Sequence, residues 1–146
     1  MGALSNKDIA IIGVCCAKRG AIELHQIENF TKAYRIAKQF KFSTSRYKEK
    51  NREIENFIIR LAKLIEPEEN RQIFRKPKGA EFSTKRAYQH FCWMFLTMIK
   101  PEELFNEFRL AWPFCDGNGR VADLIWRMAV KRDTGEWPHH FPPKKE

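Results

Sequence analysis

The sequence has a shortage of acidic residues and lacks any long apolar run. Its 18 Asp and Glu stand against 27 Lys and Arg, a net charge of +9, so we expect anionic partners such as nucleotides, nucleic acid or acidic proteins. A basic surface with no dedicated partner is the alternative. The apolar run at residues 9–17 is too short to span a bilayer and does not fit a signal peptide. We therefore expect no membrane association and a cytoplasmic protein.

Cysteine, glycine and proline are also sparse. The four cysteines show no C-x-x-C spacing and no accompanying histidine pair at zinc-ligand spacing, which argues against a disulfide framework or a zinc site and favours a reducing compartment. The apolar fraction of 43%, with 13% aromatic residues, supports a packed core. We expect one domain over residues 1–146, with its core at about 51–135 and a tail at 136–146.

Apolar residues recur at three- and four-residue steps, which predicts an all-α fold of six or seven helices. The first such face runs from Leu24 through Phe30 to Ala37, and residues 41–51 interrupt the pattern before the next helix. Proline and glycine among basic residues predict a loop or a small β-hairpin at residues 74–82. The segments with helical periodicity are residues 21–40, 51–66, 84–99, 101–112 and 119–132.

The turn between the last two predicted helices reads CDGNGR, residues 115–120. Gly117 and Gly119 allow positive φ, so backbone N–H groups can converge on an anion at the start of the next helix. Arg120 adds a fork of donors for phosphate oxygens, and Asp116 could hold Mg²⁺. The alternative is a plain polar turn in which Asn118 caps the last helix.

The segment WPFCDGNGRVAD, residues 112–123, resembles the signature of the Fic domain family, His-x-Phe-x-Asp/Glu-Gly-Asn-Gly-Arg-x-x-Arg. The likeness implies a compact Fic-like helical domain and transfer of AMP from a nucleotide to a protein hydroxyl. It implies that Asp116 carries Mg²⁺ and that residues 117–120 hold the phosphates of an ATP-like nucleotide. Residues 74–82 would be a flap that aligns a target protein by strand addition. The matching residues are Phe114, Asp116, Gly117, Asn118, Gly119 and Arg120.

Two positions depart from that signature. Trp112 stands where the family has its catalytic histidine, and an indole N–H donates but cannot accept a proton. Loss of a general base typically costs about 10²- to 10⁴-fold in rate. Asp123 stands where the family has its last arginine, and a carboxylate there repels a triphosphate. Nothing in the sequence places a histidine near Trp112 to replace the base. Cys115 lies inside the motif, but its thiol would need a lowered pKa to act, and only the glycine-rich turn and Arg120 favour that.

Three functions therefore remain open. The first is a pseudoenzyme that resembles the AMP-transferases and binds a nucleotide or phosphate ligand at the DGNGR loop without efficient transfer. It would act with a target or regulatory protein. The second is an active Fic nucleotidyl- or phosphate-group transferase with an altered donor. The third is a basic helical module that binds nucleic acid or protein, although no known nucleic-acid motif is present.

Overall fold

The computed structural model describes residues 3–41, 47–75, 84–97 and 99–143, and gives backbone only for residues 47–49. Over these residues the chain is helical and contains no strand, which confirms the predicted all-α fold. None of the described helices has a stretch long and apolar enough to cross a membrane. The helices are α1 (Asn6–Lys18), α2 (Leu24–Gln39), α3 (Tyr47–Ile65), α4 (Thr84–Leu96), α5 (Pro101–Ala111) and α6 (Asn118–Thr134).

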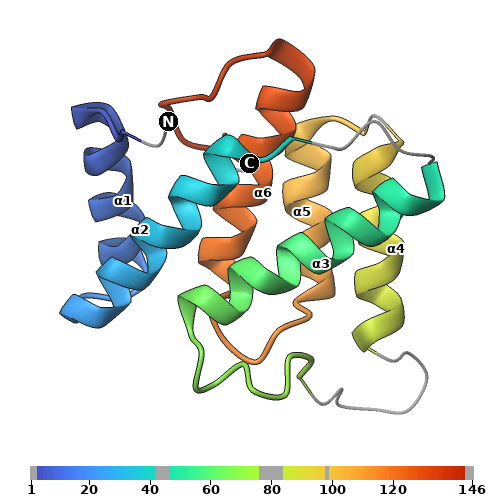
Figure 1. Cartoon of the computed structure of the whole chain (residues 1–146), viewed down its shortest axis with the longest axis horizontal. Helices are drawn as coiled ribbons and strands as arrows, with labels where there is room; N and C mark the ends of the chain where they lie inside the picture. Colours follow the sequence, from blue (N-terminus) through green and yellow to red (C-terminus); the bar gives the residue numbers. More distant parts are fainter. Residues whose placement is uncertain (1–2, 42–46, 76–83, 98, 144–146) are drawn as a thin grey trace.

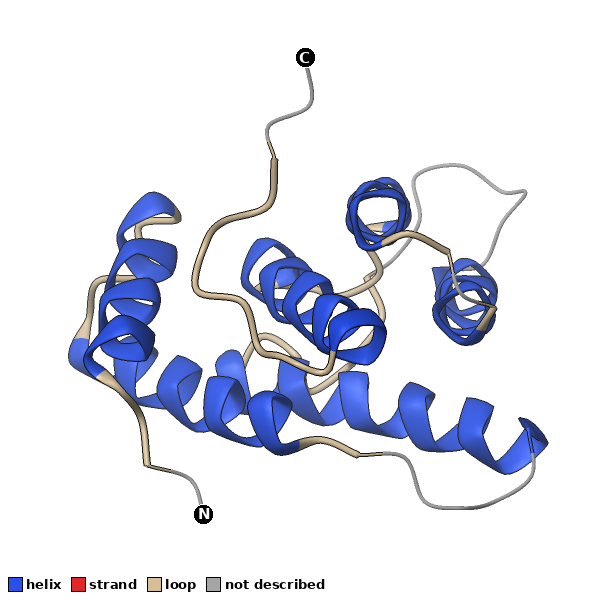
Figure 2. Cartoon of the chain, turned by 90° about the horizontal axis from the view of Figure 1, so that it is seen from above, coloured by secondary structure: helices blue, strands red, loops and turns tan. Residues whose placement is uncertain are grey.

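Helix α6 lies in the middle of the molecule (Figures 1 and 2). It packs against α1, α2, α3 and α5, while α4 packs on α3 and α5. Every residue from position 121 to position 129 is buried, as expected for a helix surrounded by others. The N-terminal end of α6 lies at the same end of the molecule as the C-terminal ends of α1 and α5 (Figure 1). The loop predicted to bind phosphate therefore lies where these three helix ends meet.

Two helix boundaries differ from the prediction. The charged residues before Asn51 were expected to interrupt the helices, but α3 already begins at Tyr47, because Lys and Glu favour helix when nothing opposes it. Leu24 was expected in the core and is 72% exposed. It is the first residue of α2, and the inward face of that helix begins farther along, at Phe30.

The predicted hairpin at residues 74–82 lies largely outside the described residues. Within the described part, Phe74 forms an isolated antiparallel bridge with Phe114. The Arg75 N–H also donates to the Pro113 carbonyl at 3.0 Å. The start of this segment is thus attached to the chain immediately before the glycine-rich loop.

The described part of the C-terminal segment, residues 137–143, runs between α1 and α6 and begins with a buried tryptophan (Figure 2). Trp137 is buried and donates its indole N–H to the Tyr34 hydroxyl at 2.8 Å. Arg127 donates to the carbonyls of Pro138 and His140 at 3.0 and 2.8 Å. The buried apolar residues, from α1 through to Trp137, form one cluster. The segment expected as a tail therefore belongs to the packed structure.

Candidate functional site

The glycine-rich loop begins at a strained residue. Trp112 ends α5 in the left-handed region, with φ 41° and ψ 58°, where a bulky side chain costs on the order of 1–3 kcal/mol. Its N–H donates to the Phe108 carbonyl at 2.9 Å, and its carbonyl accepts from the Arg75 guanidinium. The indole is 44% exposed. The backbone thus turns sharply at the position where the Fic signature has its histidine, and the Trp112 side chain stays partly accessible.

Side-chain amides fix the loop that follows. Asn118 accepts from the Phe114 N–H at 3.0 Å and donates to the Phe114 carbonyl at 2.8 Å. Asn70, fully buried, donates to the Asp116 carbonyl at 3.0 Å and accepts from its N–H at 3.1 Å. Gly117, with φ 79°, is the residue that precedes α6, and no side chain caps that helix. Asn118 therefore closes the loop and does not serve as the cap.

The first turn of α6 faces a cation. The N–H groups of residues 118–120 have no acceptor within the helix, because they belong to its first turn. A Cβ on Gly119 would lie 2.3 Å from Nε of Arg19, so only glycine at this position allows Arg19 to lie where it does. Arg19 follows directly on the C-terminus of α1. A cation beside the positive end of a helix dipole is unfavourable unless an anion joins them.

A cavity of about 330 Å³ adjoins this turn; we call it the anion pocket. Three of its lining side chains, Lys18, Arg19 and Arg109, are cationic, and Asp123 is the one acid among them. Trp112, which is partly exposed, also lines it. The full lining is Lys18, Arg19, Phe105, Asn106, Arg109, Trp112, Gly119, Ala122, Asp123, Phe141, Pro142 and Pro143.

The charge of Asp123 is already compensated. Its carboxylate is buried and accepts from Nε of Arg127 at 2.7 Å and from Nη2 at 3.3 Å. Arg127 is fully buried and also holds the C-terminal carbonyls described above. The pocket therefore has three cationic lining side chains against one acid that is already paired, and these cations lie at the C-terminal ends of α1 and α5.

Arg120 does not line the anion pocket. Its side chain is buried and its Nη2 pairs with Glu66 at 2.6 Å, while Nε and Nη1 have no partner among the described residues. Glu66 also accepts from Gln26 at 3.1 Å. The guanidinium lies close to the Cα of Gly117. The arginine expected to hold phosphates is thus placed beneath the loop, against a buried carboxylate.

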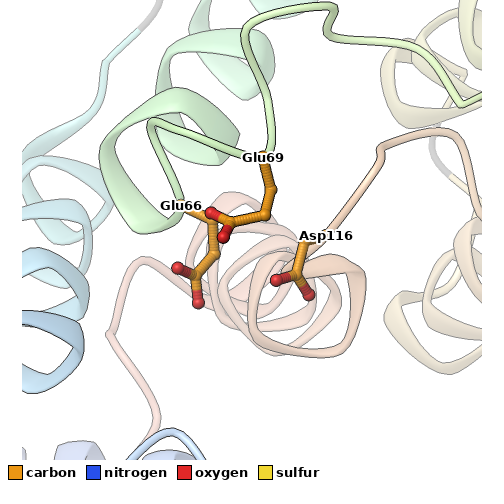
Figure 3. A group of neighbouring side chains, drawn as sticks. All are labelled: Glu66, Glu69 and Asp116. Atoms are coloured by element: carbon orange, nitrogen blue, oxygen red, sulfur yellow. The ribbon is translucent and has the colours of Figure 1, made fainter. Parts of the chain in front are cut away.

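Beside it, the carboxylates of Glu66, Glu69 and Asp116 approach one another (Figure 3). One oxygen from each lies within 4.8 Å of the others. Oxygen donors of this kind suit Mg²⁺. Glu66 is committed to Arg120, so the exposed pair Glu69 and Asp116 is the part of the cluster that could accept a cation. The donor set is chemically compatible with the predicted role of Asp116.

The alternative bases and nucleophiles lie elsewhere. Among the described residues no histidine lines the anion pocket. His90 stacks on Trp93, and His139 contacts Asp8 at 3.0 Å. Burial, with the nearby Asp123 carboxylate, raises the pKa of the Cys15 thiol to about 12. Cys115 is exposed and its thiol contacts the Gln72 carbonyl at 2.9 Å.

The structure thus divides the predicted site residues. Trp112 and Gly119 lie on the anion pocket, and Asp116 lies in the acidic cluster. Gly117 and Asn118 shape the loop, and whether these residues bind a ligand stays a prediction. Sequence reasoning missed the three cations of the pocket and Asn70, because no local pattern connects them to the loop. Comparison with models of known protein families, with curated proteins and with solved structures finds no match.

Proposed function

We propose that this chain is a degenerate member of the Fic family that binds a nucleotide, or another phosphate-bearing anion, in the anion pocket without efficient group transfer. One observation carries the proposal: Lys18, Arg19 and Arg109 line a cavity at the N-terminal turn of α6, and the single acid there, Asp123, is neutralised by Arg127. Three cations beside the positive end of a helix, with the nearby acid already paired, favour an anion.

The ligand chemistry follows from the lining. Guanidinium groups form paired hydrogen bonds with phosphate oxygens, and the N–H groups of the first turn of α6 add further donors. The half-exposed ring of Trp112 offers a face on which a base can stack. Phosphate and base together favour a nucleotide over inorganic phosphate.

The absent transfer follows from the same residues. Trp112 cannot accept a proton, and Asp123 is tied to Arg127. Mg²⁺, if held by Asp116 and Glu69, would neutralise phosphate charge. A general base would still be missing, which lowers the rate by about 10²- to 10⁴-fold.

Calorimetric titration with ATP, ADP, GTP and AMP, with and without Mg²⁺, tests the proposal. We expect at least one nucleotide to bind, and Arg19→Ala and Arg109→Ala to weaken it about tenfold or more, the usual cost of a lost charged contact. Arg60→Ala, which removes an exposed arginine of α3, is the matched control and should leave affinity unchanged. No binding at about 1 mM, a free energy of about −4 kcal/mol, would contradict the proposal.

The claim about transfer needs a separate assay. Labelled nucleotide is supplied to a lysate with wild-type protein and with Trp112→His. We expect no labelled protein with the wild type, because the base is missing. Labelling by the wild type as fast as by the histidine variant would show that another residue supplies the base, and would favour an active transferase.

A further inference from the structure

The opposite end of α6 carries two cavities that share a wall. The first, of about 480 Å³, lies between the C-terminal end of α2 and residues near the N-terminus. The second, of about 300 Å³, lies between the ends of α2, α4 and α6. Lys41 and Lys131 line both, so the two cavities adjoin. We call the adjoining pair the basic groove. Figure 1 shows the C-terminal ends of α2 and α6 at the same end of the molecule.

One half of the groove is cationic. Its charged lining residues are Arg35, Lys38, Lys41 and Lys131, and none of the described lining residues is acidic. Burial and the nearby Lys41 and Lys38 lower the pKa of Lys131, which shows that these cations disfavour one another's charge. The carboxylate that compensates Lys38 is Asp8, which is fully buried beneath it. Lys131 donates to the Lys38 carbonyl and Lys41 is exposed, so an anion entering this half would be attracted to both ammonium groups.

The other half is apolar and firmly built. Phe40, Phe95 and Met128 line it, with the stems of the basic residues at its rim. Arg132 donates to the carbonyls of Phe95 and Ile99 at 2.5 and 2.7 Å, so this wall is fixed by hydrogen bonds. A cavity of this size and lining can take one large apolar side chain.

The geometry points to the basic groove as a second binding site, for an acidic peptide segment that carries one bulky apolar side chain. Carboxylates would lie against Arg35, Lys41 and Lys131, and the apolar side chain would enter the neighbouring cavity. Charge of opposite sign speeds encounter and sets orientation, while the apolar anchor supplies affinity. A nucleic acid would need a continued row of cations for its phosphates, whereas half of this groove is apolar.

The site is independent of the nucleotide proposal. The basic groove and the anion pocket lie toward opposite ends of α6. Their lining residues on this helix, 119–123 and 128–132, are centred nine residues apart, which is about 14 Å at 1.5 Å per residue. A negative result in the nucleotide titration therefore does not predict a negative result in the peptide titration, and the reverse also holds. Nucleotide that displaced the peptide would contradict this separation.

Fluorescence anisotropy of the whole chain with a labelled peptide, Glu-Glu-Phe-Glu-Glu, tests the proposal. We expect saturable binding. It should weaken about tenfold or more when Lys41→Glu reverses an exposed charge, the usual cost of a lost charged contact. Replacing the peptide's Phe by Ala should weaken binding by a similar factor, because it removes the buried apolar side chain. Lys63→Glu, at an exposed position of α3, is the matched control and should leave binding unchanged.

Three outcomes would overturn the proposal. One is no saturation at about 1 mM peptide. Another is equal loss in Lys41→Glu and Lys63→Glu, which would show only attraction to the overall charge. The third is tighter binding of a single-stranded DNA oligonucleotide that displaces the peptide, which would make the groove a nucleic-acid site.

Discussion

Asp8 joins three parts of the chain, and removing its charge tests how they are held together. Its buried carboxylate accepts from the Tyr34 hydroxyl at 2.6 Å and from Lys38 Nζ at 2.7 Å. It also contacts His139 at 3.0 Å and closes a capping box with Ser5 at the start of α1. The change Asp8→Asn keeps the shape of the side chain and removes the charge, so it isolates the electrostatic part of this junction.

The expected loss of stability can be worked from these contacts. Breaking a buried ion pair costs about 3–5 kcal/mol, but Lys38 is 29% exposed on its side chain and can turn toward water. We therefore expect Asp8→Asn to lower the free energy of unfolding at pH 7 by about 2–3 kcal/mol.

The pH dependence gives a second magnitude. Burial alone would raise the pKa of Asp8, but the hydrogen bonds from Lys38, Tyr34 and Ser5 outweigh it and hold the pKa well below its usual range. A depressed pKa contributes stability above the unfolded value, near 3.9, that is lost as the pH falls. At about pH 3 the unfolded carboxyl is mostly protonated, and about 1.3 kcal/mol of the contribution is gone.

Urea unfolding of both proteins at pH 7 and pH 3 measures this difference. His139 also contacts Asp8, so both proteins should carry His139→Gln to remove any contribution from that side chain. The difference in free energy of unfolding between the Asp8 protein and its Asn variant should be about 1.3 kcal/mol smaller at pH 3 than at pH 7. A difference that stays constant would mean that the folded carboxyl is not held ionised, and the reasoning would fail.

Three further changes probe the loop. Glu66→Gln should lower the free energy of unfolding, measured in urea, by about 3 kcal/mol, because it leaves the buried Arg120 without a counter-charge. A loss of under about 1 kcal/mol would indicate that the ion pair is screened by solvent and not buried. Gly119→Ala should weaken nucleotide binding because it displaces Arg19, while the free energy of unfolding stays within about 1 kcal/mol of wild type. Unchanged affinity in calorimetry would show that Arg19 does not contribute to the site. Gly117→Ala should destabilise by about 1–3 kcal/mol, because its φ is 79° and its Cβ would lie 3.1 Å from a side-chain carbon; an unchanged melting temperature would contradict this.

The helical fold was predictable because its signal is local. Apolar spacing located α4, α5 and α6, and proline marked the break before α5. The spacing failed at the ends of helices, where packing decides which residues are covered, as Leu24 shows. It also missed the packing of the C-terminal segment, since the bonds from Arg127 to the carbonyls of Pro138 and His140 leave no periodic pattern.

The site was predictable only in its backbone. Two glycines within three residues indicated a sharp turn into a helix, and Gly117 indeed has positive φ. Which side chains face that turn depends on tertiary contacts. Arg19 follows on α1 and reaches Gly119 across 100 residues of sequence, while the adjacent Arg120 turns inward to Glu66. Proximity in sequence therefore identified the loop but not its cations.

The two departures from the Fic signature have a common consequence if the proposed function is correct. The position that would hold an arginine is Asp123, and its partner Arg127 fixes the C-terminal segment, whose residues 141–143 line one side of the anion pocket. The position that would hold the base is Trp112, which also lines the pocket. Under the proposed function, both positions therefore lack the group that the family signature uses for transfer, while both contribute to the wall of the anion pocket. Such a site would hold an anion without transferring part of it, and the nucleotide titration and the labelling assay test these two halves of the proposal separately.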